Sequence, residues 1–334
     1  MTLPRSQQII PGQPGFYHCI SRCVRRAWLC GDDPLTARNY DYRRQWIVER
    51  LHTLSACFAV DIYAYSVMSN HTHLVLHVEP DRIDQLKDAE VIRRYKTVWN
   101  WRNPAKPLKL PTAVPKKTLK SWRKRLGDVS WFMRLLNEPI ARMANAEDNC
   151  KGHFWESRFK SIPILDEAGL LTCMTYVDLN PIKAGVAQTL EDCDYTSIQH
   201  RVLALIDAAK AKANAPLAPV MTDPSPRKGL RKKAGKRTGR KRNAVKDSVG
   251  IITRRYIELV QRTAENLLAD EPELEHAELE CLEMAPEGWV TVATDFLTLF
   301  RSAAGGYAAF EKFMERTGRT RRQDLLGRKL LFTD

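Results

Sequence analysis

The alternation of apolar and polar positions predicts four strands in the first half of the chain. These runs are rich in strand-forming side chains and bounded by polar residues. The predicted strands cover residues 15–24, 59–68, 72–79 and 158–165. The second and third are separated only by residues 69–71 (SNH), a short polar connection that suits an antiparallel hairpin.

Apolar residues that recur every three or four positions predict helices between and after these strands. The predicted helices cover residues 40–58, 82–88, 129–145, 167–180, 248–270, 288–303 and 306–316. Asp166 is expected to cap the fourth of them and Pro181 to end it, because the residue before a proline is pushed out of the α region. The order of elements favours an α+β fold with helices packed on a four-stranded antiparallel sheet, and a ferredoxin-like fold is the simplest such arrangement.

Composition divides the chain into three parts. The 334 residues are 44% hydrophobic, enough for a packed core, which excludes disorder over the whole chain. We expect a domain over residues 1–206 with a basic insertion at about 81–128. Residues 207–247 have few large apolar side chains and are expected to form a flexible basic linker. Residues 248–334 are expected to form a helical C-terminal domain, to which the sequence assigns no role.

The net charge of +14 is concentrated in two segments. Residues 93–125 and 227–246 contain many Lys and Arg and no acidic residue, whereas the rest of the chain is net acidic. Such segments favour a polyanionic partner, above all nucleic acid, because neutralised phosphates release condensed counterions. The alternative is that these cations form ordinary solvated faces.

Several classes of protein are excluded by what the sequence lacks. The N-terminal residues 1–15 have no apolar core of a signal peptide, and no run of 18 apolar residues is available to span a membrane. The eight cysteines are widely spaced without a CxxC pair, which favours reduced thiols in a cytoplasm.

Two pairs of side chains are candidates for chemistry. His71 and His73 flank Thr72 at the start of a predicted strand, so both imidazoles face the same side and can bind one divalent metal. Tyr176 and Asn180 are spaced i, i+4 and share one helix face. Taken singly, each pair is also explained as packing or hydrogen bonding, but a helix laid across the sheet can bring the tyrosine to the histidines.

The residues that carry these pairs resemble a known family. SNHTHLVLHV, followed about a hundred residues later by TYVDLNPIKAG, is similar to the single-tyrosine HUH transposases, and specifically to the REP-associated tyrosine transposases of bacteria. The resemblance covers roughly residues 12–200, including FYHCISRCVRR, and leaves the chain from about residue 207 unmatched. Thr72 stands where the family has a bulky hydrophobic residue.

The resemblance implies a role for each residue of the two pairs. His71, His73 and Asn180 would hold Mg²⁺ or Mn²⁺, and Tyr176 would attack single-stranded DNA near a hairpin, leaving a 5′-phosphotyrosine and a free 3′-hydroxyl. The expected function is therefore a metal-dependent DNA strand transferase in the bacterial cytoplasm, associated with the nucleoid, as a monomer or homodimer. The alternatives are a non-catalytic protein that binds nucleic-acid hairpins and, less favoured, a replication initiator or relaxase.

Other tyrosines and the basic segments complete the prediction. Tyr63, Tyr65, Tyr95 and Tyr195 are rival nucleophiles, but only Tyr176 has the Tyr-x3-Asn-Pro context. Aromatic and basic side chains together can stack unpaired bases and bind phosphates. The predicted DNA-binding residues are Arg94, Lys96, Trp99, Trp101, Arg102, Lys120, Trp122, Arg123, Lys124, Arg125, Arg231, Lys232, Lys233, Arg240, Lys241 and Arg242. For the tryptophans, burial in the core is the alternative.

Overall fold

The protein is built around one antiparallel sheet. The computed structural model describes residues 8–24, 29–33, 37–102, 108–109, 113–206, 217, 253–267, 279, 284–318 and 325–331. The sheet has the strand order β4-β5-β1-β6, and a two-stranded ribbon, β2-β3, stands apart from it. The strands are β1 (Gly15–Arg22), β2 (Asp32–Asp33), β3 (Arg38–Asn39), β4 (Val60–Val67), β5 (His71–Val78) and β6 (Lys160–Ile164).

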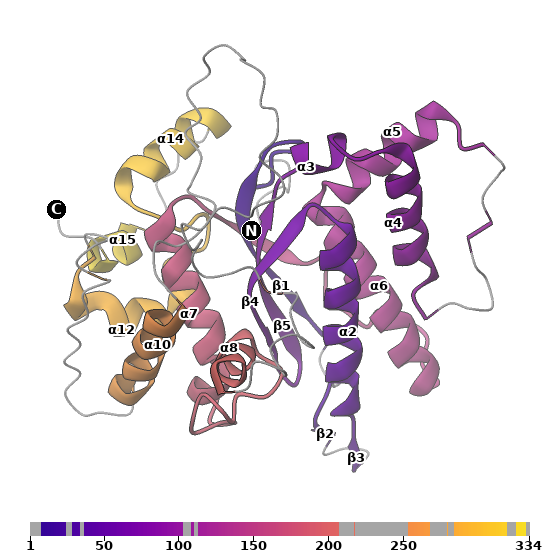
Figure 1. Ribbon diagram of the computed structural model, residues 1–334. Helices are drawn as coiled ribbons and strands as arrows, with labels where there is room; N and C mark the ends of the chain where they lie inside the picture. Colours follow the sequence, from indigo (N-terminus) through magenta and orange to yellow (C-terminus); the bar gives the residue numbers. More distant parts are fainter. Residues whose placement is uncertain are drawn as a thin grey trace.

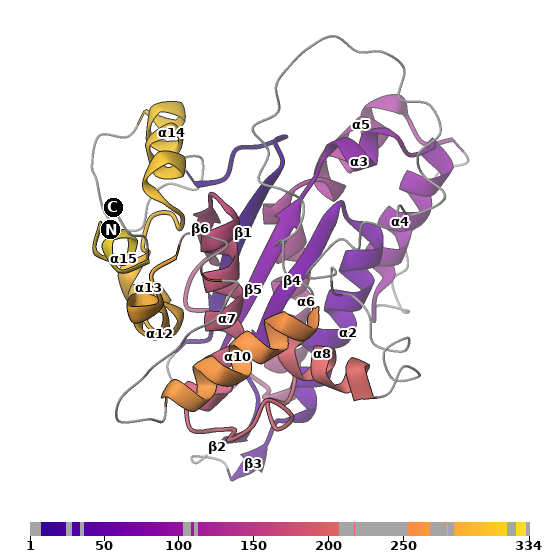
Figure 2. The ribbon, with the colours of Figure 1, turned by 60° about the vertical axis from the view of Figure 1, so that its left-hand side comes forward.

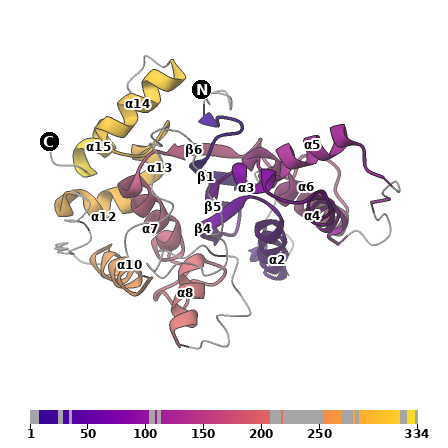
Figure 3. The ribbon, with the colours of Figure 1, turned by 45° about the horizontal axis from the view of Figure 1, so that its top comes forward.

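Helices cover both faces of this sheet (Figures 1 and 3). One face carries α2 (Tyr42–Cys57), α4 (Asp88–Asn100), α5 (Lys116–Leu126) and α6 (Val129–Glu147), with the short α3 (Asp81–Asp84) beside α5. The other face carries α7 (Glu167–Lys183) and α8 (Ser197–Ile206). Each face has its own hydrophobic cluster, so β1, β4 and β5 are buried along almost their whole length.

The C-terminal helices pack on the side of α7 that faces away from the sheet, and Figure 2 shows α10 lying across α7. They are α10 (Thr253–Leu267), α12 (Pro286–Thr294), α13 (Phe296–Leu299), α14 (Tyr307–Thr317) and α15 (Leu325–Leu331). Side chains of α7, α10, α12 and α13 belong to one hydrophobic cluster. Because α7 lies between the sheet and these helices, most of its residues are buried.

The α+β prediction is confirmed. All four strands form within two residues of their expected ends and pair antiparallel, and β4 and β5 form the expected hairpin. The narrower assignment to a ferredoxin-like core stays a prediction, as does the division into domains. Of the predicted linker 207–247, all but Leu217 lies outside the described residues.

One helix boundary was wrong. Asp166 does cap α7, with its Oδ1 accepting the N–H of Gly169 at 2.8 Å, but the helix continues past Pro181 to Lys183. Proline removes one helical hydrogen bond. Here Pro181 and Ile182 are buried, and this burial offsets the loss for the single turn that remains.

The remaining differences lie where the sequence pattern is weak. The expected helix over residues 288–303 is two helices that meet at Asp295, and the basic insertion contains the helices α4 and α5. The short helices α8 and α15 were not predicted. In the described part of the chain, no helix combines the length and the apolar character needed to cross a membrane.

Residues 303–306 join the C-terminal helices to β6 and α7. Ala304 donates its N–H to Pro163 O at 2.9 Å and accepts from Leu165 N at 2.8 Å, so this segment runs along the outer edge of β6. Gly306 N–H donates to Asp166 Oδ2 at 2.6 Å. Gly169 permits this approach, because a Cβ there would lie 3.0 Å from the Ala304 backbone. Asp166 therefore holds both the start of α7 and the C-terminal segment.

Candidate functional site

His71 and His73 lie side by side on the face of β5 that α7 covers. Strand alternation places them two residues apart on one face, and their ring centroids are 4.8 Å apart with the planes nearly perpendicular. His71 is the first residue of the strand and half-buried, whereas His73 is buried. The structure therefore brings the two histidines together as the sequence predicted.

A third histidine, His18 on β1, is hydrogen bonded to this pair. Its Nε2 lies 2.9 Å from Nδ1 of His73, and both side chains are buried. Burial lowers the pKa of His18 to about 3 and holds that of His73 well below its usual value, so both rings are neutral at pH 7. One hydrogen bond between two neutral imidazoles has one donor, so the tautomer of each ring fixes that of the other.

His18 was not among the site residues predicted from the sequence. Strand alternation places it on one face of β1, but only the register shows that this face meets His73. In that register His18 lies opposite Val75, and Ile20 lies opposite His73. The pairing is diagonal, which is within reach of a ring.

His71 is fixed by its neighbour and lies beside a cation. Its Nδ1 is 2.6 Å from Oδ1 of Asn70. Arg22, which is exposed, lies directly opposite His71 on β1 and so shares its face. Burial, followed by the positive charge of Arg22, lowers the pKa of His71 to about 4.

Tyr176 on α7 faces the histidines. Its ring centroid is 5.5 Å from that of His73 and 5.9 Å from that of His18, edge to face in both contacts. Asn180 donates a hydrogen bond from Nδ2 to the main-chain O of Tyr176 at 2.8 Å. Burial raises the pKa of Tyr176 to about 12, while a hydrogen bond from the Asn180 side chain opposes this rise. The fold thus brings Tyr176 of the helix into contact with His73 of the strand, as expected.

The third ring in contact with Tyr176 comes from the C-terminal helices. Phe296, the first residue of α13, stacks on Tyr176 with centroids 5.6 Å apart and planes 26° apart. The same phenyl ring meets His18 edge to face at 5.6 Å. No pattern in the sequence links Phe296 to the site.

The rival tyrosines make other contacts. Tyr63 packs against Phe16 and His77, and Tyr65 Oη is hydrogen bonded to His200 Nδ1 at 2.7 Å. Tyr95 Oη accepts from Arg125, and Tyr195 lies below the guanidinium of Arg44. Among the described residues, Tyr65, Tyr95 and Tyr195 make no ring contact with His71 or His73.

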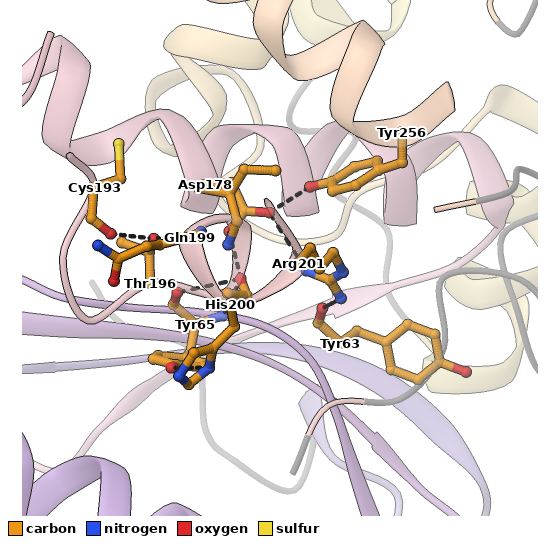
Figure 4. Close-up of polar contacts among 11 residues, drawn as sticks. Tyr63, Tyr65, Asp178, Cys193, Thr196, Gln199, His200, Arg201 and Tyr256 are labelled. Atoms are coloured by element: carbon orange, nitrogen blue, oxygen red, sulfur yellow. Dashed lines mark hydrogen bonds and ion pairs between the residues drawn. The ribbon is translucent and has the colours of Figure 1, made fainter. Parts of the chain in front are cut away.

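Directly after Tyr176, α7 is anchored by a buried carboxylate (Figure 4). Asp178 accepts hydrogen bonds from Tyr256 Oη at 2.6 Å, from Ile198 N at 3.1 Å and from Ser197 Oγ, and Arg201 lies 3.6 Å away. Burial raises the pKa of Asp178, whereas these partners lower it. The network joins α8 and α10 to the helix that carries Tyr176.

The predicted DNA-binding aromatics are placed differently from one another. Trp122 is buried and stacks on Tyr95 with centroids 4.3 Å apart, and Trp101 is half-buried beneath the Arg50 guanidinium. Trp99 is 45% exposed. Of the three rings, only Trp99 therefore presents a large open surface.

Some of the predicted DNA-binding cations bind other protein groups, and others are exposed. Several bind protein groups: Arg94 pairs with Glu90, Arg102 with Glu49 and Arg123 with Asp88, and Arg125 donates to Tyr95. Lys96, Lys120 and Lys124 are exposed and form no ion pair within the described ranges. Arg231, Lys232, Lys233, Arg240, Lys241 and Arg242 lie outside the described residues.

The donor set fits a divalent metal, although its third member is an amide. Among the described residues, no three His, Cys, Asp or Glu side chains are grouped to hold a metal ion. The hydrogen bonds at Nδ1 of His71 and His73 leave Nε2 of each ring as the ligating atom. A hydrogen bond to the other ring nitrogen orients an imidazole that binds a metal. Asn180 uses Nδ2 on the main chain, which leaves its Oδ1 for a metal. Two imidazoles and one amide oxygen leave an octahedral ion with three open positions.

Comparisons with known proteins give one distant likeness. No protein-family profile and no curated protein matches the sequence. A solved structure described as "Structure of the REP associates tyrosine transposase bound to a REP hairpin" resembles this chain with a TM-score of 0.37. The sequence identity is 15%, and the match covers 61% of this chain and 86% of that chain.

Proposed function

We propose that the protein is a metal-dependent, single-stranded DNA endonuclease and strand transferase that uses Tyr176 as its nucleophile. The observation that carries the proposal is the meeting of Tyr176 with His73, 5.5 Å between centroids, and of His73 with His71, although the tyrosine is a hundred residues away in the chain. A phenol beside two neutral imidazoles and a carboxamide is a suitable set for phosphoryl transfer. The sequence motifs around these residues support the same assignment.

His71, His73 and Asn180 would hold Mg²⁺ or Mn²⁺, and such an ion, when bound, polarises a phosphate and offsets the charge that develops in the reaction. The imidazoles must be neutral to act as ligands, and burial keeps them so. His18 would hold His73 in the tautomer with Nδ1–H, which leaves the lone pair on Nε2. His71, His73 and Asn180 would therefore act by holding the ion beside Tyr176.

Tyr176 would form a bond between its Oη and the phosphorus of the scissile phosphate. The bond from phosphorus to the 3′ oxygen breaks, and the phenolic proton is transferred, in the net reaction, to that oxygen. The products are a 5′-phosphotyrosine and a free 3′-hydroxyl, and the ester retains the free energy needed to rejoin a strand. Arg22, exposed opposite His71, supplies a positive charge on the side where a phosphate would enter.

Exposed lysines on α4 and α5 would bind the DNA backbone. Lys116, Lys117, Lys120 and Lys124 recur at helical spacing on the exposed side of α5, whereas Leu119, Trp122 and Leu126 form its buried side. Trp99 on α4 offers an exposed ring for an unpaired base. Sequence selection of a hairpin is part of the proposal, and its basis is the resemblance of the motifs.

The test is incubation of the full chain and Mn²⁺ with labelled single-stranded hairpins from palindromes that flank its own gene, followed by denaturing electrophoresis. We expect a covalent protein–DNA band with wild type and with Tyr63→Phe, and none with Tyr176→Phe. A band that persists in Tyr176→Phe would refute the assigned nucleophile. Binding without a covalent band under any divalent metal would instead favour a non-catalytic hairpin-binding protein.

A further inference from the structure

The ring of Tyr176 is enclosed on three sides by other rings. His73 and His18 meet it edge to face from the sheet, and Phe296 stacks on it from the C-terminal helices. Phe296 is fully buried, and only 9% of Tyr176 is exposed. The sheet therefore fixes one side of the phenol ring, and among the described residues its stacked partner comes from a segment 120 residues further along the chain.

Phe296 is held rigidly with respect to α7. The residue before it, Asp295, pairs with Lys183 at the end of α7 at 2.5 Å, and Lys183 Nζ also donates to Thr294 O at 2.7 Å. On the far side of α13, Ala304 is hydrogen bonded to the main chain at the edge of β6. Phe296 lies between these two attachments, so its ring belongs to the wall of the site and is not on a free loop.

The interior of the C-terminal helices also fixes this ring. Phe300 packs against Phe296 with centroids 5.2 Å apart and is fully buried. The α13 segment is in turn packed against α15, where Gly327 lies so close to Phe300 that a Cβ would be 3.0 Å from its ring. Phe300 therefore packs behind Phe296, and in the described part of the chain its ring does not contact Tyr176.

We propose that Phe296 is a positioning residue that holds the phenol ring of Tyr176 in the orientation needed for attack, so that the C-terminal helices complete the site formed by the sheet and α7. The proposal rests on the function proposed above. A nucleophile reacts well only in a narrow range of positions, and an offset of about 1 Å can lower a rate on the order of a hundredfold. Stacked aromatic rings prefer a defined relative orientation, and an aliphatic side chain in place of Phe296 would not provide this preference.

The experiment compares Phe296→Leu with Phe300→Leu in the full chain. Both remove a fully buried phenyl ring from the same segment, but only the first ring touches Tyr176. The first readout needs no DNA: the protein is labelled with 3-fluorotyrosine, and the ¹⁹F resonance of Tyr176 is assigned by its absence in Tyr176→Phe. We expect this resonance to shift and to sharpen through faster ring rotation in Phe296→Leu and to change much less in Phe300→Leu, which leaves the stacked ring in place.

The second readout is the single-turnover rate of covalent adduct formation on a labelled synthetic hairpin with Mn²⁺, together with the dissociation constant of the same hairpin. We expect Phe296→Leu to lower the rate roughly tenfold to a hundredfold and to change affinity less than twofold. Phe300→Leu, at a comparable loss of melting temperature, should retain the rate within about threefold, as expected for a ring that does not touch the nucleophile.

Two results would overturn the proposal. One is an unchanged Tyr176 resonance in Phe296→Leu, and the other is an equal loss of rate in Phe300→Leu. Absence of any adduct with wild type would refute the proposed function, and the ¹⁹F comparison would then still decide whether Phe296 orients Tyr176. A variant that fails to fold is replaced by Phe296→Met against Phe300→Met, because the flexible Met side chain adapts better to the space that the ring leaves.

Discussion

Nε2 of His18 and Nδ1 of His73 lie 2.9 Å apart on neighbouring strands, both buried. Within the described part of the chain, no hydrogen-bond partner reaches His18 Nδ1. A partner for the non-ligating nitrogen of an imidazole sets its tautomer and its basicity. His18, by its hydrogen bond to Nδ1 of His73, therefore helps to determine whether Nε2 of His73 is free to bind a metal.

We expect His18→Phe to weaken Mn²⁺ binding about tenfold to a hundredfold, because the variant removes the hydrogen bond to a metal-binding imidazole. The phenyl ring fills the space, but it leaves His73 Nδ1 without a partner, at a cost of about 1–3 kcal/mol in stability. Isothermal titration calorimetry with Mn²⁺ measures the affinity. The control is His77→Phe, on β5 and on the same face of the sheet, where His77 stacks on Phe16 and not on His18 or His73. An equal loss of affinity in this variant would contradict a specific role for His18.

Without metal, Tyr176 should titrate far above an ordinary tyrosine. Burial disfavours the phenolate and raises the pKa of Tyr176 to about 12, so at pH 7 the hydroxyl keeps its proton. The difference between ultraviolet titrations of wild type and Tyr176→Phe isolates this group. We expect its midpoint near 12, above the value of about 10 for an exposed tyrosine. A midpoint near 10 would contradict a buried Tyr176 hydroxyl.

The lysines of α5 should account for a measurable part of DNA affinity. Replacing Lys120 and Lys124 with Ala removes two exposed cations, so affinity for a single-stranded hairpin should fall and its dependence on salt should become shallower by about 0.7 for each lost phosphate contact. Fluorescence anisotropy at salt concentrations between about 50 and 200 mM measures the affinity and its dependence on salt, which is strong in this range. Lys312→Ala, an exposed lysine on α14, is the matched control. If it weakens binding equally, the effect is one of net charge and not of α5.

His200 should make the fold weaker in mild acid. Burial, then the charges of His52 and Arg201, lowers its pKa to about 4, below the value of about 6.5 in an unfolded chain. Above pH 6.5 the residue is neutral in both states. Between pH 6.5 and 4 the unfolded chain binds a proton that the folded chain does not, so the free energy of unfolding falls as pH falls through this window.

The variant His200→Asn retains a polar partner for Tyr65 Oη and removes the titration. Urea unfolding between pH 7.5 and 4.5 should give a difference between wild type and variant that shrinks as the pH falls. The exposed residue His153 gives the control variant His153→Asn. A difference that is constant with pH would show that His200 does not contribute to the acid sensitivity.

The sequence predicted what depends on spacing along one element. Alternation placed His71 and His73 on one face, and helical spacing placed Tyr176 with Asn180, and the structure has both arrangements. The contact between Tyr176 and His73 required only that α7 cross the sheet at the right point, which the sequence allowed without fixing.

What depends on contacts between distant elements was not predictable. His18 reaches His73 through the register of β1 and β5, and Phe296 reaches Tyr176 through the packing of α13 on α7. Neither arrangement leaves a periodic signal in a single sequence. The prediction that α7 ends before Pro181 was wrong for the same reason, because other helices bury the additional turn and so stabilise it.

Residues 303–306 have a consequence for any shortened form of the chain. In the described sheet, β6 is an outermost strand, and Ala304 occupies its outer hydrogen-bonding groups. A chain that ended before residue 284 would leave that edge unpaired and would lack α12 and α13, so that part of the outer side of α7 would be uncovered. Open strand edges pair with other molecules. Such a fragment would therefore self-associate into β-aggregates, even though it would keep His71, His73, Tyr176 and Asn180.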